Sequence, residues 1–247
     1  MPQWLMLSLF FFVVVTTHIL EGITGFGSTA LSIPFLSVLM GIEIAKPLLM
    51  LYTCFLSVYI LTRSLKQVEW KHLGIMAGVA ALGLPIGLLL YNRLPKPLLL
   101  GLLAVFVIVV SVRGLLMVSG LVKKKKEQTR TGVLMPVLFV GGIIQGAFAS
   151  GGPLVIVYAT EKITDKSRFR ATMCVFWLVM DIVLLTEMGL TGQLGWPVWN
   201  MSLVGLPFLV LGTVLGDLAH SRVGDKLFLW LTYGILLIAG VFMLFSL

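Results

Sequence analysis

Residues 131–160 read TGVLMPVLFVGGIIQGAFASGGPLVIVYAT, a run of thirty positions without Asp, Glu, Lys or Arg. Basic clusters at 123–130 and 162–170 flank the run, and basic loops gather on the cytoplasmic side of a membrane. The run must therefore enter and leave by one face, but two full helical crossings would need about forty residues. It predicts a hairpin that turns inside the membrane near residues 145–153, with a return arm about 15 Å long.

The composition of the whole chain agrees with a membrane location. Hydrophobic residues make up 59% and charged residues 11%, whereas about a quarter of the residues of a soluble domain are charged. The charge-free runs 1–20, 73–92 and 227–247 are each long enough to cross about 30 Å of hydrocarbon. The net charge of +8 comes from Lys and Arg in short gaps between apolar segments, not from a basic groove. Lipid is the expected partner, and nucleic acid is excluded.

The gaps between charge clusters divide the chain into ten apolar segments. The longest basic gap, with Lys123, Lys124, Lys125, Lys126 and Arg130, separates five segments from five. We predict a first repeat over 1–118, a cytoplasmic basic linker over 119–131 and a second repeat over 132–247. The segments cover 4–20, 23–41, 44–62, 73–91, 97–118, 132–149, 151–160, 171–190, 198–219 and 227–246.

Three motif pairs recur in the two halves in the same order: Gly22-x4-Gly27 with Gly146-x4-Gly151, Gln67-x-x-Trp70 with Gln193-x-x-Trp196, and Gly83-x3-Gly87 with Gly212-x3-Gly216. Because five is odd, the second copy must be inverted relative to the first. The predicted fold is an all-α polytopic membrane protein of two inverted repeats, each a hairpin or broken-helix pair plus three transmembrane helices. By the repeat, 4–41 is a mirror hairpin turning near 21–28, although two full spans remain an alternative.

The distribution of positive charge predicts the orientation. If every segment changes sides, fourteen of the eighteen Lys and Arg residues fall on one face, and three (Lys46, Arg93 and Lys96) on the other. The positive-inside rule then places the 123–130 loop in the cytoplasm and both termini outside. If 23–41 and 151–160 were surface loops, the split would be nearly even, which disfavours that alternative.

The two predicted turns are rich in glycine and hydroxyl side chains. Gly25, Gly27, Ser28 and Thr29 lie in one turn, and Ser150, Gly151 and Gly152 lie in the other. Glycine exposes backbone N–H groups, hydroxyls add donors, and the following helix N-termini carry partial positive charge. Inverted hairpin turns that meet near the midplane are typical of carrier substrate sites. This pattern favours a small oxyanion as the bound solute; tight helix packing at the glycines is the alternative.

The stretch GITGFGSTALSIP at 22–34, GAFASGGP at 146–153, Ala171-Thr172 and the Trp70/Trp196 pair resemble the sulfite exporter TauE/SafE family from about residue 10 to 245. The resemblance implies a multi-pass protein of the bacterial inner membrane that exports sulfite, sulfoacetate or related organosulfonates, coupled to a proton or ion gradient. It implies a transporter, not an enzyme, with no cofactor. The chain departs from the family at Ser28-Thr29, where a glycine run is common, and at Lys46-Pro47, in place of Ala-x-Thr.

The candidate site residues follow from the turns and from the buried charges. Asp181 lies mid-segment, where a charge costs about 3 kcal/mol or more unless it is paired or wet. Asp181, Glu21, His18 and Lys46 are therefore the candidates for proton or ion coupling, with structural roles as the alternative; no metal ligands are predicted. The predicted substrate-binding residues are Gly22, Thr24, Gly25, Gly27, Ser28, Thr29, Gln145, Gly146, Ser150, Gly151, Gly152 and Arg170.

Two other functions remain open at this point. An anion channel would need a continuous polar lining, which few segments have. A membrane thiol-disulfide relay could use Cys54 and Cys174, which lie in corresponding segments but in no Cys-x-x-Cys setting. No nucleotide-binding loop occurs, so the sequence gives no sign of ATP hydrolysis. The sequence does not decide between a monomer and a homodimer.

Overall fold

The computed structural model describes residues 3–121 and 131–220, with positions 226, 230, 233, 234, 237, 238, 240, 241, 244 and 245. Most of the predicted basic linker and of the tenth apolar segment therefore lie outside the described residues. Within the described part every regular element is helical, which confirms the all-α prediction. The helices are α1 (Gln3–Thr24), α2 (Ser28–Met40), α3 (Ile42–Ser64), η1 (Leu65–Gln67), α4 (Trp70–Arg93), α5 (Lys96–Val118), α6 (Thr131–Phe148), α7 (Gly152–Lys162), α8 (Lys166–Leu190) and α9 (Trp196–Ala219).

Six of these helices, α1, α3, α4, α5, α8 and α9, are long and apolar enough to cross a membrane. Their outward sides carry large exposed apolar side chains, such as Leu82 on α4, Val109 on α5 and Leu203 on α9. A soluble protein rarely exposes so much continuous apolar surface, because it would associate or aggregate. These helices confirm the prediction of a polytopic membrane protein.

The chain breaks between α1 and α2 at 25–27, and between α6 and α7 at 149–151, inside both predicted turn ranges. The 13 residues of α2 and the 11 of α7 reach about 20 Å and 16 Å, less than a membrane crossing. In contrast, the 22 residues of α1 are enough for a full crossing. The first hairpin therefore has one long and one short arm. Both 23–41 and 151–160 are mainly helical, so neither range is an irregular loop.

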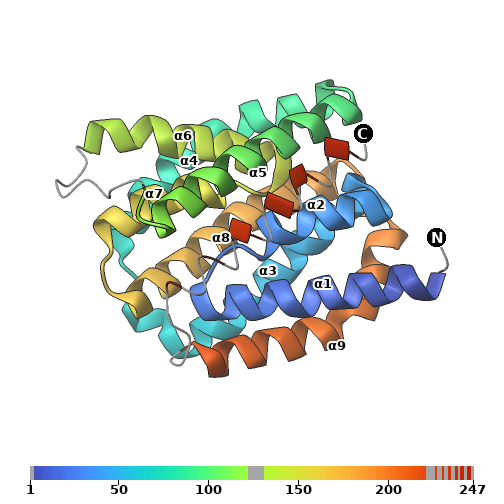
Figure 1. The fold of residues 1–247 in the computed structure, drawn as a ribbon, viewed down its shortest axis with the longest axis horizontal. Coiled ribbons are helices and arrows are strands. Elements are labelled where there is room, and N and C mark those ends of the chain that lie inside the picture. The colour runs from blue at the N-terminus through green and yellow to red at the C-terminus, as the bar shows by residue number, and fades with distance from the viewer. Residues whose placement is uncertain are drawn as a thin grey trace.

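Close contacts between glycines bring each hairpin against a helix of the other half. Helix α1 lies beside α9, and α6 lies beside α4 (Figure 1). A Cβ added at Gly22 would lie 2.9 Å from Gly216 Cα, and one at Gly146 would lie 3.1 Å from Gly87 Cα. Backbones can approach this closely only where both helices carry small residues. The helices of each pair run in the same direction, because contacts along α1 and α9, and along α4 and α6, advance together.

The interior of the molecule is built on α3 and α8, which pack against each other. Two main groups of buried side chains flank them, one including Leu48 of α3 and the other including Phe176 of α8. The broken ends of both hairpins point toward this pair. Polar residues on α3 and α8 are thereby placed opposite the two turns.

Candidate substrate site between the two turns

Left-handed backbone conformations end the first arm of each hairpin. The φ angles are +80° at Gly25, +104° at Gly27 and +52° at Ala149. Glycine adopts such angles freely, whereas an L-residue with a Cβ pays about 1–2 kcal/mol. At Gly25 space is also restricted, since an added Cβ would lie 2.8 Å from Arg170 O. The helices break at these residues because their backbone leaves the right-handed region.

A cavity of about 20 Å³ lies where the two turns meet. Its walls come from α1, α2, α3, α6, the second turn, α7 and α8. Seven of the predicted site and coupling residues line it: Glu21, Gly27, Thr29, Gln145, Ser150, Gly152 and Asp181. Four further lining residues are Ala30, Thr53, Ala149 and Trp177, which the sequence patterns did not point to. Thr53 and Trp177 are ordinary residues of apolar helices, and only their packing against the turns reveals them.

Hydrogen bonds tie most polar groups of the cavity wall together. The Ser28 hydroxyl donates to a Glu21 carboxyl oxygen. Gln145 joins two groups, since its Nε2 donates to Asp181 Oδ1 at 2.8 Å and its Oε1 accepts from Gly151 N at 2.9 Å. The second turn is thus linked through a single side chain to α8.

Two buried donors in the cavity wall lack a partner. Ser150 is 2% exposed and Trp177 is 5% exposed, yet Ser150 Oγ and Trp177 Nε1 make no hydrogen bond with the described residues. Buried polar groups are nearly always satisfied in folded proteins, so an unpaired donor in a cavity points to a ligand or water. Two donors and a turn rich in N–H groups match the acceptor oxygens of an oxyanion.

Carboxyl groups line the cavity, and the nearby basic side chains lie outside its lining. Among the described residues that line it, Glu21 and Asp181 are the ionisable ones. Lys46 lies outside the lining and is fully buried. Its Nζ donates to Gly146 O at 2.7 Å and sits 3.9 Å from the centre of the Tyr91 ring. Lys46 therefore brings positive charge to the end of α6 without entering the cavity.

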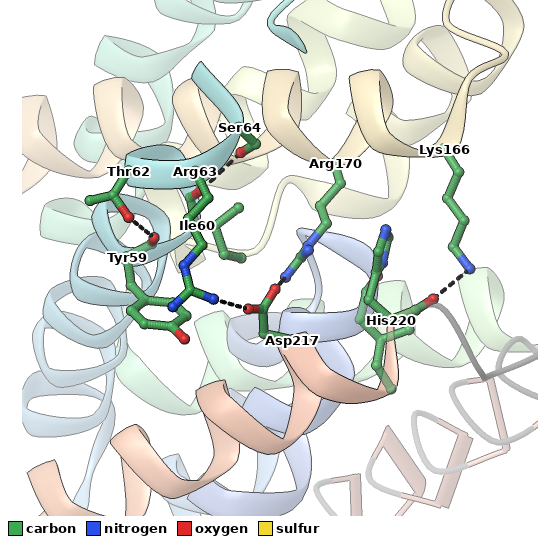
Figure 2. Close-up of polar contacts among 10 residues, drawn as sticks. Tyr59, Ile60, Thr62, Arg63, Ser64, Lys166, Arg170, Asp217 and His220 are labelled. Atoms are coloured by element: carbon green, nitrogen blue, oxygen red, sulfur yellow. Dashed lines mark hydrogen bonds and ion pairs between the residues drawn. The ribbon is translucent and has the colours of Figure 1, made fainter. Parts of the chain in front are cut away.

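Arg170 lies in an ion cluster beside the first turn, outside the cavity lining. Figure 2 shows Arg63 and Arg170 both reaching Asp217, with N–O distances of 3.2 Å and 2.8 Å. His220 lies next to this cluster, where Nδ1–H donates to Ile23 O at the end of α1. Burial lowers the pKa of His220 below its ordinary value. The ion cluster joins α3, α8 and α9, and the neighbouring His220 connects the end of α9 to the end of α1.

The remaining predicted residues have structural contacts in this conformation. Gly22 and Gly146 lie at the close contacts between helices. Thr24 Oγ1 donates to Leu20 O and Phe26 O, both at 2.9 Å, and so closes the backbone of the first turn. His18 Nδ1 lies 2.8 Å from Val14 O, its ring packs edge-on against Tyr52, and its Nε2 is buried without a partner. Cys54 and Cys174 are free thiols, and neither lines the cavity.

Six long apolar helices, with two helix breaks at the walls of a small buried cavity, define a polytopic membrane protein. The chain belongs to the sulfite exporter TauE/SafE family, whose model matches residues 9–243. The family is described as one of sulfite exporters.

A curated relative is the "Probable inner membrane transporter protein TsaS" of Comamonas testosteroni, which is 27% identical over 156 residues. The alignment covers 62% of this chain and 62% of that protein, so the chain spans less than two thirds of its relative. No solved structure matches the chain significantly.

Proposed function

We propose that the protein is a secondary transporter that exports a small sulfur-containing anion, such as sulfite, sulfoacetate or another organosulfonate. The observation that carries the proposal is a pair of buried, unpartnered donors, Ser150 Oγ and Trp177 Nε1, on two residues that line the cavity between the turns. A hydrogen bond to a charged acceptor contributes about 1.5–3 kcal/mol, so two such donors favour an oxyanion. The family description, which names sulfite, supports the substrate class.

The size of the cavity favours a carrier over an anion channel. A volume of about 20 Å³ accommodates one water molecule, and a sulfur oxyanion is larger. The two turns must therefore separate to admit the substrate. A closed site that opens by movement of packed helices is the property of a carrier, whereas a channel has a continuous polar path.

Internal repetition supports movement of one half against the other. Equivalent positions lie 124 residues apart in the hairpins and in α3 and α8, and 129 apart in α4 and α9. Under this register the left-handed residues that end the first arms, Gly25 and Ala149, correspond, as do the cavity residues of α1 and α6. The pairs are Gly25/Ala149, Glu21/Gln145, Lys46/Arg170, Thr53/Trp177, Gly87/Gly216 and Tyr91/His220. We infer from these pairs that 1–118 and 132–247 are inverted copies related by a pseudo-twofold axis through the cavity.

The orientation in the membrane follows the positive-inside rule. Alternating crossings require α1 to run parallel to α9 and α4 parallel to α6, and the observed helix directions agree with this requirement. We place the 123–130 loop in the cytoplasm and both termini in the periplasm of a bacterial inner membrane. Export then carries the anion from the face with the basic loops to the opposite face.

The test is anion binding by the detergent-purified protein. Thermal shift is measured with sulfite, sulfate, thiosulfate, sulfoacetate, taurine and short carboxylates. Ser150→Ala and Trp177→Phe each remove one unpartnered donor, so each is expected to weaken binding of the stabilising anion about tenfold or more. Ser37→Ala is the matched control, because its hydroxyl is also buried and unpartnered but lies outside the cavity lining.

The controls make the outcome decisive. Since Ser150 Oγ has no partner to lose, the melting temperature of Ser150→Ala without ligand is expected to change little. Trp177→Phe also loses buried ring contacts, so its affinity is compared after its own ligand-free melting temperature is measured. Stabilisation by cations or neutral solutes, with none by any oxyanion, would show that the proposed substrate class is wrong. If Ser150→Ala, Trp177→Phe and Ser37→Ala all bind the anion with equal affinity, the binding site does not lie in this cavity.

A further inference from the structure

The side chain of Gln145 connects a carboxyl group of the cavity to a backbone N–H of the second turn. Its amide lies between Asp181 Oδ1, at 2.8 Å, and Gly151 N, at 2.9 Å. Gln145 is 1% exposed and Asp181 is 2% exposed, so bulk water does not compete for these bonds. Gly151 lies between Ser150 and Gly152, which both line the cavity.

Hydrogen-bond chemistry fixes which end of the amide faces which partner. The Gly151 N–H can only donate, so the oxygen of Gln145 must face it. The amide NH₂ of Gln145 then faces Asp181, which must accept and therefore presents an oxygen without a proton. In this arrangement Gln145 occupies the Gly151 N–H, a donor that a bound oxyanion would need.

A proton on Asp181 allows the reverse arrangement. A carboxylate could not face the oxygen of Gln145, but a protonated carboxyl group can donate its O–H to that oxygen once the amide turns. When the amide turns its oxygen to Asp181, its NH₂ would face the Gly151 N–H, and two donors do not bond. The Gly151 N–H is then released toward the cavity.

We propose that protonation of Asp181, transmitted by Gln145, releases the Gly151 N–H for the substrate, so that one proton binds together with each anion. The proposal rests on the proposed function, since it deepens the same site. The proton comes from water, forms an O–H bond with an Asp181 carboxyl oxygen, and leaves from that oxygen when the anion departs. Protonated Asp181 is neutral, so it does not repel the anion while the anion is bound in the closed cavity.

The charges around Asp181 favour this coupling. The charged and titratable groups that face it are Glu21 of α1 and Lys46 and Cys54 of α3, with Gln145 of α6 as its hydrogen-bond partner. Glu21 supplies a second carboxyl group that can carry a negative charge, and an anion would add a further charge inside a small buried cavity. Like charges at this depth cost several kcal/mol, and one bound proton removes the charge nearest to the second turn.

Glu21 is bonded differently from Asp181. It corresponds to Gln145 in the repeat, but its carboxyl group accepts from the hydroxyl of Ser28 and not from an amide that contacts a turn N–H. Protonation of Glu21 therefore leaves the Gly151 N–H as it is. Glu21→Gln is the control that separates a general loss of negative charge from the specific link through Gln145.

The coupling of proton and anion is measured as the pH dependence of anion affinity. Binding of sulfite, methanesulfonate and sulfate to the full-length protein is followed from about pH 5 to about pH 8. Above the pH at which Asp181 loses its proton, the affinity of the wild-type protein for the anion is expected to fall by up to about tenfold per pH unit. This slope follows because binding of one anion is linked to binding of one proton. Comparison of each variant with wild type at the same pH cancels the titration of sulfite itself.

Asp181→Asn carries a permanent donor in place of the protonated acid, so it is expected to bind with little pH dependence and to stay tight at about pH 8. Gln145→Leu and Gln145→Met remove the amide that connects Asp181 to Gly151. Both variants are expected to lose most of the pH dependence of anion affinity. Glu21→Gln is expected to keep the slope, whatever its affinity. Asparagine keeps the size of Asp181, so this variant tests the proposal even if the Gln145 variants fold poorly.

Three results would overturn the proposal while leaving the proposed anion site in place. They are a wild-type affinity that does not change with pH, a full slope in both Gln145 variants, and a slope lost in Glu21→Gln but kept in Asp181→Asn. An affinity that depends on Na⁺ and not on pH would assign the coupling to a cation instead. Absence of binding by every anion at every pH would overturn the proposed function itself.

Discussion

The contact between α4 and α6 gives the sharpest test of the packing. A Cβ at Gly87 would lie 2.1 Å from Ile143 O and 2.9 Å from Gly146 Cα. A carbon approaches a carbonyl oxygen to about 3.3 Å at closest, so the new methyl group is about 1.2 Å too close. Both obstructing atoms are backbone, and no side-chain rotation relieves the clash. Gly87→Ala must therefore push the two helices apart or bend one of them.

The cost can be estimated against a control on the same helix. An added Cβ at Gly78 meets nothing within 4 Å. Both variants gain up to about 1 kcal/mol from helix propensity, but Gly87→Ala also pays about 1–3 kcal/mol for overpacking. The two proteins should therefore differ by about 1–3 kcal/mol. For a chain of this size the difference corresponds to roughly 2–12 °C in melting temperature.

The assay is thermal unfolding of Gly87→Ala and Gly78→Ala, purified in the same detergent. Gly78→Ala is expected to melt at or above the wild-type temperature, and Gly87→Ala below it. If Gly87→Ala is as stable as Gly78→Ala, the helices do not approach each other as closely as the structure has them. The close packing of each hairpin against the other half would then be wrong.

Three further predictions concern the first hairpin and its ion cluster. Asp217→Asn should destabilise the protein by more than about 1 kcal/mol, because the side chain of Arg170 is 10% exposed and loses its partner; Arg63→Gln should cost under about 1 kcal/mol, since Arg63 is 69% exposed. Both losses of stability are measured as the difference in melting temperature from the wild-type protein. Burial lowers the pKa of His220 from 6.5, so the unfolded chain takes up this proton before the folded protein. The stability that neutral His220 contributes is therefore complete above about pH 6.5 and is lost as the pH falls, and His220→Gln should show a smaller loss in the same titration. Gly25→Ala should lower the melting temperature, because φ of +80° costs about 1–2 kcal/mol and the Cβ meets a carbonyl at 2.8 Å; an unchanged value would contradict that backbone geometry.

Much of the helical architecture could be predicted from the sequence. The length of the apolar run 131–160 predicted a break inside it, and the chain does break at 149–151. Repetition of the Gly-x4-Gly motif at Gly22 and Gly27 predicted the break in the first hairpin, found at 25–27. These predictions succeeded because the hydrocarbon thickness sets a minimum length for a crossing and because only certain residues leave a helix easily. The length of α1 was not decided, since an uninterrupted apolar run is compatible with either a half or a full crossing.

The contents of the site depended on the tertiary structure. Sequence reasoning gathered the polar residues of both turns into one group. The packing instead directs Ser150 into the cavity, Arg170 to Asp217, and Gly22 to the close contact with α9. Trp177 gave no signal in the sequence, because an aromatic residue in an apolar helix is ordinary until its neighbours are known.

The sequence by itself determined that the chain is a helical membrane protein with two breaks, because hydropathy, length and glycine spacing act locally along the chain. It also determined the charge asymmetry from which the orientation is predicted. Only the tertiary structure decided that Gln145 lies between Asp181 and Gly151, since these residues come from different helices or from opposite ends of a turn. Hydrogen bonds between distant segments depend on how helices pack, and hydrophobic periodicity does not specify that packing to within a bond length.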